Sequence, residues 1–206
     1  MINIEGSKPE LRRSLLAVRA RLTADDIADA RSRLACRALE LPELAEARTV
    51  AAYVSIGGEP GTEGLREALR ARGVRVLLPV LMEDNDLDWG RDEGPGRLVR
   101  ARRGLLEPEG PRLGPEAVTG ADVVLLPGLA VDRRGVRLGR GGGSYDRVLA
   151  RLDRAGARPA LVVLLYDGEV LDDVPGEAHD RPVHAAITPS AVHRFRAAQG
   201  PTQGPA

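Results

Sequence analysis

The sequence predicts an α/β protein, a single domain with three αβα layers around a mostly parallel central sheet. Four short, β-branched apolar runs have the composition of buried parallel strands: residues 49–55, 74–78, 121–126 and 160–166. Segments with helical spacing separate these runs, an alternation typical of parallel sheets. The chain has 206 residues, of which 43% are hydrophobic, so it is large enough to fill one core. We expect the domain at residues 1–196 and a disordered tail at residues 197–206.

Composition excludes several classes of function. The chain carries 30 basic and 30 acidic residues, so it has no net positive charge for binding nucleic acid or an anionic membrane. No apolar run is long enough to span a membrane, and residues 1–10 lack the apolar stretch of a signal peptide. Cys36, the only cysteine, cannot form an internal disulfide and is expected to pack against its helix neighbours. We expect a cytoplasmic monomer with no nucleic-acid or membrane partner.

A first helix is expected to begin at Lys8. Ser7 and Glu10 have the spacing of a capping box, and Pro9 occupies the first turn, where it loses no hydrogen bond. The helix has an apolar stripe formed by Leu11, Leu15, Leu16 and Val18. A basic rim flanks it, formed by Arg12, Arg13 and Arg19. Lys8, the only lysine, lies four residues before Arg12 and shares a helix face with it. Together they could hold a polyphosphate; the alternative interpretation is a solvated basic face.

The elements that follow place a candidate residue at the end of a strand. Thr23 is expected to cap a helix ending near residue 39, and the next strand leads into a loop at residues 56–61. Thr62 is expected to cap a further helix that Gly73 closes. Ligands of open α/β sheets bind in loops of this kind, so Glu59 is a candidate site residue. Its alternative role is that of an acid favoured near a helix N-terminus.

Residues 84–115 are rich in glycine, proline and charge, which indicates a partly irregular excursion rather than an interdomain linker. We expect residues 87–89 and 97–100 to form a short hairpin. Trp89, the only tryptophan, is expected to pack in the core, with stacking on a ligand ring as the alternative.

A glycine-rich loop follows the strand at residues 121–126. Four glycines remove side chains just before a helix expected from Tyr145 onward: Gly139, Gly141, Gly142 and Gly143. Backbone N–H groups of such a loop can approach an anion closely. Two guanidinium groups suited to phosphate and a carboxylate of the kind Mg²⁺ accepts lie beside it: Arg137, Arg140 and Asp146. A glycine-rich turn is often only a turn, and this spacing fits neither a P-loop nor a Rossmann fingerprint, so the combination carries the prediction of a phosphate site.

The remainder of the chain supplies the last strands. Residues 160–166 and 184–188 are expected to be strands, and an acidic loop at residues 172–180 separates them. The adjacent pair His179 and Asp180 in this loop would by itself indicate only a loop hydrogen bond, not a zinc ligand.

Residues 127–147, PGLAVDRRGVRLGRGGGSYDR, resemble a motif of the 5-formyltetrahydrofolate cyclo-ligases, also called 5,10-methenyltetrahydrofolate synthetases. The family pattern is Pro-Gly-x-Ala-Phe-Asp, followed by Arg-Leu-Gly-x-Gly-x-Gly-Tyr-Tyr-Asp. This sequence departs from it at Val131, where the family usually has Phe, and at Ser144, where it usually has the first Tyr. Shorter segments also resemble the family, in the same order along the chain: residues 8–12, 53–62, 104–108 and 175–180.

The resemblance implies an ATP-dependent ligase that converts 5-formyltetrahydrofolate to 5,10-methenyltetrahydrofolate and releases ADP and phosphate. It implies ATP contacts at Lys8, Pro9, Glu10, Leu11, Arg12, Arg137, Leu138, Gly139, Arg140, Gly141, Gly142, Gly143, Ser144 and Tyr145. Among these, Arg140 and Lys8 are the expected catalytic residues. The resemblance further implies folate contacts at Val54 and Glu59, a pocket border at residues 104–108, and Mg²⁺ at Asp146 and Asp180.

Two other functions remain open on the residues alone. A sugar-phosphate isomerase or acyl-transferase-like α/β enzyme could bind a phosphate monoester at the glycine loop and would not hydrolyse ATP. A folate- or nucleotide-binding regulator could keep the pocket without catalysis, an interpretation that the departures at Val131 and Ser144 leave open.

Overall fold

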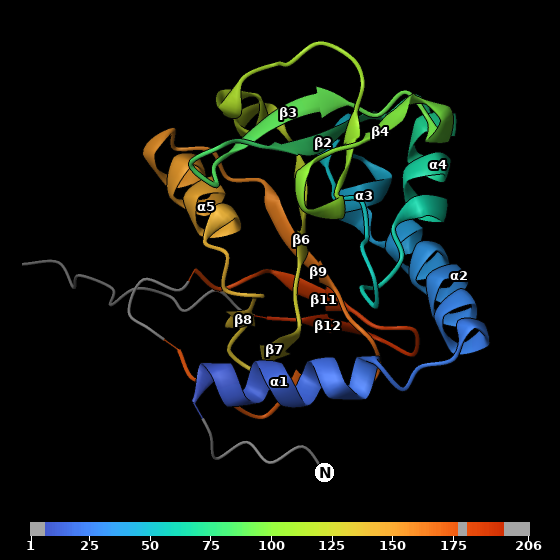
Figure 1. Cartoon of the computed structure of the whole chain (residues 1–206), viewed down its shortest axis with the longest axis vertical. Coiled ribbons are helices and arrows are strands. Elements are labelled where there is room, and N and C mark those ends of the chain that lie inside the picture. Colours follow the sequence, from blue (N-terminus) through green and yellow to red (C-terminus); the bar gives the residue numbers. More distant parts are fainter. Residues whose placement is uncertain (1–6, 177–180, 196–206) are drawn as a thin grey trace, which may run out of the picture.

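The computed structural model describes residues 7–176 and 181–195, and its centre is a seven-stranded sheet (Figure 1). The strands lie in the order β12-β11-β9-β6-β1-β2-β3. Their bounds are β1 Thr49–Ala51, β2 Arg75–Leu81, β3 Leu87–Arg91, β6 Val123–Pro127, β9 Ala160–Leu164, β11 Ala185–Ile187 and β12 Val192–Arg194. The inner strands from β11 to β2 pair in parallel, whereas β3 and β12 are antiparallel at the two edges. The expected mostly parallel sheet is confirmed.

Helices cover both faces of this sheet, which completes the expected three layers. One face packs against α2 (Ala24–Glu40), α3 (Pro42–Ala45) and α4 (Glu63–Ala71), and the other packs against α5 (Ser144–Arg154) and the 3₁₀ helix η3 (Pro115–Gly120). Neighbouring residues of one strand alternate between the faces, as strand geometry requires: Val50 belongs to the first core and Ala51 to the second. Figure 1 shows α5 on one side of the sheet and α2 and α4 on the other. No helix in the described ranges is long and apolar enough to cross a membrane.

The first helix, α1 (Lys8–Arg19), packs on a small sheet of β10 (Val170–Leu171), β7 (Ala130–Asp132) and β8 (Arg137–Leu138), below the central sheet in Figure 1. Leu11 and Leu15 are buried there, but Leu16 and Val18 are 39% and 46% exposed, so the predicted apolar stripe is too wide.

Arg19 lies in the interior rather than at the predicted rim of α1. Its Nε lies 2.7 Å from Glu169 Oε1, its Nη2 donates to Glu169 Oε2 and the Gly128 carbonyl, and its guanidinium lies over the Tyr166 ring. The ion pair fixes the helix against the residue before β10, and the Gly128 hydrogen bond fixes it against the loop that follows β6.

The chain between β2 and β6 differs from the predicted hairpin. β3 pairs with β2 rather than with residues 97–100, and β4 (Leu98–Arg100) pairs instead with β5 (Leu106–Pro108). Short 3₁₀ helices, η1 (Pro95–Arg97) and η2 (Arg102–Gly104), precede β4 and join it to β5. The partner of a strand depends on tertiary packing, which a composition pattern does not contain. Trp89 is fully buried between the sheet and α5, so it packs in the core and does not stack on a ligand.

Local helix signals are confirmed at two of three positions. Glu10 accepts hydrogen bonds from the backbone and hydroxyl of Ser7, and Thr23 forms a capping box with Asp26. Thr62 precedes α4 but does not cap it with its side chain; its hydroxyl donates to the Tyr53 carbonyl at 2.6 Å. This bond ties the loop at residues 56–61 to the end of β1.

The prediction that Cys36 packs against its helix neighbours is wrong. Cys36 lies on the exposed face of α2, whereas Leu34 and Ala38 fill the core. A helix turns by about 100° per residue, so a position two residues from each of these faces away from the sheet.

Candidate functional site

A cavity of about 760 Å³ opens at the carboxyl ends of the central parallel strands. Tyr53 and Val54 follow β1, Leu81 ends β2, and Pro127 and Gly128 lie at the end of β6; all five line the cavity. Crevices at this edge of an open α/β sheet are where such folds bind ligands. The fold therefore places the cavity where the sequence analysis expected a site.

One wall of the cavity is the glycine loop between β8 and α5. Gly141 and Gly143 have φ values of +89° and +75°, a left-handed conformation that strains any residue with a side chain. Gly143 is also the N-cap of α5, so the free N–H groups of the helix begin at this loop. Loop and helix terminus together form a surface suited to phosphate oxygens.

The N-terminal helix α1 forms the adjoining wall. Lys8, Pro9 and Arg12 line the same cavity as the glycine loop, although they lie more than a hundred residues earlier in the chain. Arg12 Nε donates to the Gly139 carbonyl at 2.8 Å, which joins α1 to the loop directly. Lys8 and Arg140, the two expected catalytic residues, thus share one cleft.

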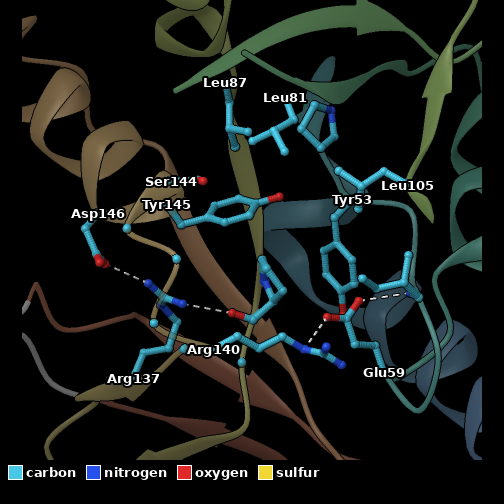
Figure 2. Close-up of a pocket in the computed structure, with 18 of the residues that line it drawn as sticks. Tyr53, Glu59, Leu81, Leu87, Leu105, Arg137, Arg140, Ser144, Tyr145 and Asp146 are labelled. Atoms are coloured by element: carbon cyan, nitrogen blue, oxygen red, sulfur yellow. Dashed lines mark hydrogen bonds and ion pairs between the residues drawn. The ribbon is translucent and has the colours of Figure 1, made fainter. Parts of the chain in front are cut away.

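Arg137 is a buried arginine that supports the glycine loop. Its side chain is 8% exposed, its Nη1 donates to the Pro127 carbonyl at 2.9 Å, and its Nη2 lies 3.1 Å from Asp146 Oδ1 (Figure 2). Asp146, in the first turn of α5, is 61% exposed and lines the cavity. Arg137 therefore connects the end of β6 to the start of α5 and directs the Asp146 carboxylate.

Arg140 and Glu59 form an ion pair across the cavity (Figure 2). Arg140 Nε lies 3.1 Å from Glu59 Oε1, and the Ile56 N–H donates to Glu59 Oε2 at 3.0 Å. The Glu59 side chain is 8% exposed and the Arg140 side chain 45%. Burial raises the pKa of Glu59, and the Ile56 hydrogen bond and the Arg140 charge offset this only in part. The pair joins the expected folate position to the expected phosphate position.

The opposite wall is apolar. Leu81, Leu87 and Leu105 lie across the cavity from Arg137 and Asp146, with the Tyr53 and Tyr145 rings between the two walls (Figure 2). The Tyr145 hydroxyl is buried and has no hydrogen-bond partner among the described residues. Burial raises its pKa, so the phenol stays protonated. It is a donor available to a ligand.

The sequence analysis missed several cavity residues. These are Tyr53, Ile56, Pro79, Leu81, Leu87, Arg103, Pro127 and Gly128. Most of them lie at or near the carboxyl ends of β1, β2 and β6, and that position was the signal that could have identified them.

Most of the predicted site residues line the cavity, with three exceptions. Glu10 caps its own helix, Leu11 is buried in the core beneath α1, and neither lines the cavity; Asp180 lies outside the described residues, as does His179. No group of three or more His, Cys, Asp or Glu residues that could hold a metal occurs in the described ranges.

Sequence comparisons find similar proteins over most of the chain. A sequence model of the 5-formyltetrahydrofolate cyclo-ligase family matches residues 4–189. The chain is 46% identical to the 5-formyltetrahydrofolate cyclo-ligase of Mycolicibacterium smegmatis over 147 residues, which cover 69% of this chain and 74% of the relative. It is 33% identical to the enzyme of the same name from Escherichia coli over 176 residues, 84% of this chain and 96% of the relative.

Solved structures show the same architecture. The 5,10-methenyltetrahydrofolate synthetase of Aquifex aeolicus superposes with a TM-score of 0.78 at 30% identity, covering 94% of this chain and 95% of that one. A synthetase from Mycoplasma pneumoniae superposes with a TM-score of 0.69 at 20% identity, covering 88% of this chain and 98% of that one, which supports the fold.

Proposed function

Because the chain belongs to the 5-formyltetrahydrofolate cyclo-ligase family, a family of ligases, we propose that its cavity holds ATP and 5-formyltetrahydrofolate side by side. The single observation that carries this proposal is the composition of the cavity. A phosphate-suited surface of main-chain N–H groups and cations faces an apolar wall across one space of about 760 Å³. An anionic nucleotide and a pterin ring need these two surfaces.

The reaction needs alignment of two groups. The formyl oxygen of the substrate is a poor leaving group, so the γ-phosphate of ATP is transferred to it and ADP leaves. The side-arm nitrogen then attacks the formyl carbon, the carbon–oxygen bond breaks, the nitrogen loses its proton, and phosphate departs with the former formyl oxygen. Phosphoryl transfer of this kind depends on positioning and neutralisation of charge more than on covalent catalysis.

The phosphate-binding part of the site is assigned to the glycine loop and α1. Backbone N–H groups at residues 139–143 point toward the triphosphate, and Lys8, Arg12 and Arg140 neutralise its charge. Arg140, released from Glu59, stabilises the charge that develops on the transferred phosphoryl group. Arg137 positions rather than contacts the phosphates, because its Nη atoms already hold Pro127 and Asp146.

The folate-binding part of the site is assigned to the end of β1 and the leucine wall. Glu59 and Val54 hold the pterin, whose N–H groups are donors that a buried carboxylate accepts. The ring lies beside Tyr145, and the leucine wall excludes water from the reactive phosphorylated formamide.

Magnesium is assigned to Asp146. A hard cation of this kind takes one or two carboxylates together with phosphate oxygens, and Asp146 is a partly exposed carboxylate at the edge of the phosphate surface. When bound, Mg²⁺ would neutralise negative charge on the triphosphate. Asp180 remains a proposed second position.

The single-domain organisation, the monomeric state and the cytoplasmic location are proposed on the same footing. The family membership favours catalysis over the regulator interpretation, and the two-sided cavity favours it over the isomerase interpretation, which needs no second substrate surface.

One assay tests the function. Purified protein is mixed with ATP, Mg²⁺ and 5-formyltetrahydrofolate, and methenyl absorbance in the near ultraviolet is followed. We expect absorbance that requires ATP. A regulator would bind folate without product, and an isomerase-like enzyme would neither bind folate nor form product; either result contradicts the proposal.

A further inference from the structure

Arg103 is a cation at the mouth of the cavity that the reaction as described does not use. It belongs to η2, between β4 and β5, and it lines the cavity next to Leu105 and Leu106. Its neighbour Arg102 does not line the cavity. The charge of Arg103 therefore lies at the apolar end, next to the residues of the leucine wall.

The backbone of Arg103 is strained. Its φ and ψ are +59° and +21°, the left-handed helical region, and Asn85 is the only other residue besides glycine with positive φ in the described ranges. Asn tolerates this region because its short side chain can bond locally, whereas Arg does not gain that compensation. Strained residues of this kind concentrate at ligand-binding positions.

The guanidinium of Arg103 also has no protein partner in the described ranges. Two nearby arginines on the same excursion are paired: Arg97 contacts Glu93 and Glu109, and Arg102 reaches Glu83 at 3.7 Å. Arg100 likewise lacks a partner among the described residues, but it does not line the cavity. The other cations that line the cavity also interact with the protein, as Arg12 does with Gly139. Arg103 is thus a charge that the folded chain leaves available at the cavity mouth.

The position of Arg103 indicates which anionic group of the two substrates it could bind. Leu105 and Leu81 lie across the cavity from Arg137 and Asp146, so the phosphate surface is on the far wall (Figure 2). ATP bound along that surface presents its phosphates away from Arg103, and its adenine carries no charge. The remaining anionic groups are the glutamate carboxylates of the folate, which lie at the opposite end of that molecule from the pterin.

We propose that Arg103 binds the glutamate carboxylate of 5-formyltetrahydrofolate and is a specificity-determining residue for the folate side chain. This inference rests on the proposed function for the identity of its ligand. With the pterin at Glu59, the aminobenzoyl group lies along Leu81 and Leu105, and the glutamate reaches the cavity mouth. The planar guanidinium fork matches a carboxylate there.

Equilibrium binding of two ligands tests this assignment. One is 5-formyltetrahydrofolate and the other is 5-formyltetrahydropteroate, which lacks the glutamate. Arg103→Gly removes the side chain and relaxes the backbone, so lost folding is not a confounding effect; Arg102→Gly is the matched control one position away. We expect Arg103→Gly to weaken binding of the first ligand about 5- to 10-fold, the scale of a partly exposed charge-assisted contact, and to leave the second unchanged.

The variants also separate charge from shape. Arg103→Lys should recover part of the lost affinity for 5-formyltetrahydrofolate, kcat should be unchanged in Arg103→Gly while KM rises, and Arg102→Gly should bind both ligands as the native protein does. Equal weakening of both ligands in Arg103→Gly, or no weakening of either, overturns the assignment. Affinity is measured without turnover. If the protein binds folate but forms no product, the proposed reaction is wrong, and the binding data still test the role of Arg103.

Discussion

The ion pair between Arg140 and Glu59 leads us to expect that one mutation in the binding site strengthens nucleotide binding rather than weakening it. If Arg140 must leave Glu59 to reach the phosphates, then Glu59→Gln should tighten the binding of a non-hydrolysable ATP analogue in the absence of folate. Glutamine keeps an oxygen for the Ile56 N–H but has no charge to hold Arg140. Folate should have the same effect on the native protein, because it engages Glu59.

The size of the effect follows from the exposure of the pair. Arg140 is 45% exposed and Glu59 8%, so solvent screens the arginine end and the pair is worth about 1 kcal/mol. At that value Arg140 is released in about 15% of molecules, and the apparent nucleotide affinity is lowered by about six- to seven-fold. Glu59→Gln should recover that factor, and folate should no longer improve nucleotide affinity in the variant.

Calorimetric titration of the ATP analogue, with and without 5-formyltetrahydrofolate, measures both quantities. Glu63→Gln is a matched control, because Glu63 pairs with Arg31 on the exposed face of α4 and does not line the cavity. Its nucleotide affinity should equal that of the native protein. If Glu59→Gln binds the analogue no more tightly than the native chain, the pair does not restrain Arg140.

The same variant has a predictable pH dependence. Burial raises the pKa of Glu59 in the folded protein above its unfolded value, so its stability contribution is fully present below the ordinary glutamate pKa. That contribution is lost as pH rises through the raised pKa. The free energy of unfolding of Glu59→Gln relative to the native protein should therefore increase from acid to neutral pH. Denaturant unfolding at several pH values measures it, and a decrease over this range contradicts the assignment.

Four further substitutions separate catalysis, binding and stability. Arg140→Ala should lower kcat by about 100-fold or more, the scale for losing a preorganised charge stabiliser, and activity within a few-fold of native refutes its role. Gly142→Ala has open space around the added methyl group, so thermal stability should match the Gly120→Ala control, but nucleotide affinity should fall because phosphate can no longer approach the backbone. Glu169→Ala leaves a buried arginine unpaired and should lower the free energy of unfolding by about 3–5 kcal/mol in denaturant titration. Asp146→Asn should raise the Mg²⁺ concentration needed for half-maximal rate, and an unchanged Mg²⁺ titration argues against this carboxylate as a ligand.

Local signals in the sequence predicted much of the fold. The capping box predicted at Ser7 and the cap predicted at Thr23 depend on residues three positions apart, and both form. The apolar runs predicted the buried parallel strands, because burial on both faces leaves no other composition. Thr62 shows the limit of such signals. The sequence predicts that it caps α4, but its hydroxyl donates to the Tyr53 carbonyl instead.

Long-range pairing is what the sequence left undetermined. Nothing near Arg19 in the chain indicates that Glu169 will bury it, and nothing near Arg140 indicates Glu59. Nothing in the local sequence of β3 indicates that it pairs with β2 either. In each case the partner is chosen by tertiary packing, which brings together residues that local periodicity treats as independent.

Site motifs predicted the cations and glycines of the cavity but not its apolar wall. Gly141 and Arg140 belong to a dense local pattern, whereas Leu81 and Leu105 are ordinary leucines until the fold places them opposite that pattern. Their functional meaning comes from position alone.

The central claim is that one cavity aligns the formyl oxygen of the folate with the γ-phosphate of ATP. Its most direct test uses 5-formyltetrahydrofolate labelled with a heavy isotope of oxygen in the formyl group, followed by mass analysis of the inorganic phosphate released in one turnover. The account predicts that the label appears in phosphate in proportion to the methenyl product. Label found in water instead, with unlabelled phosphate, would contradict it.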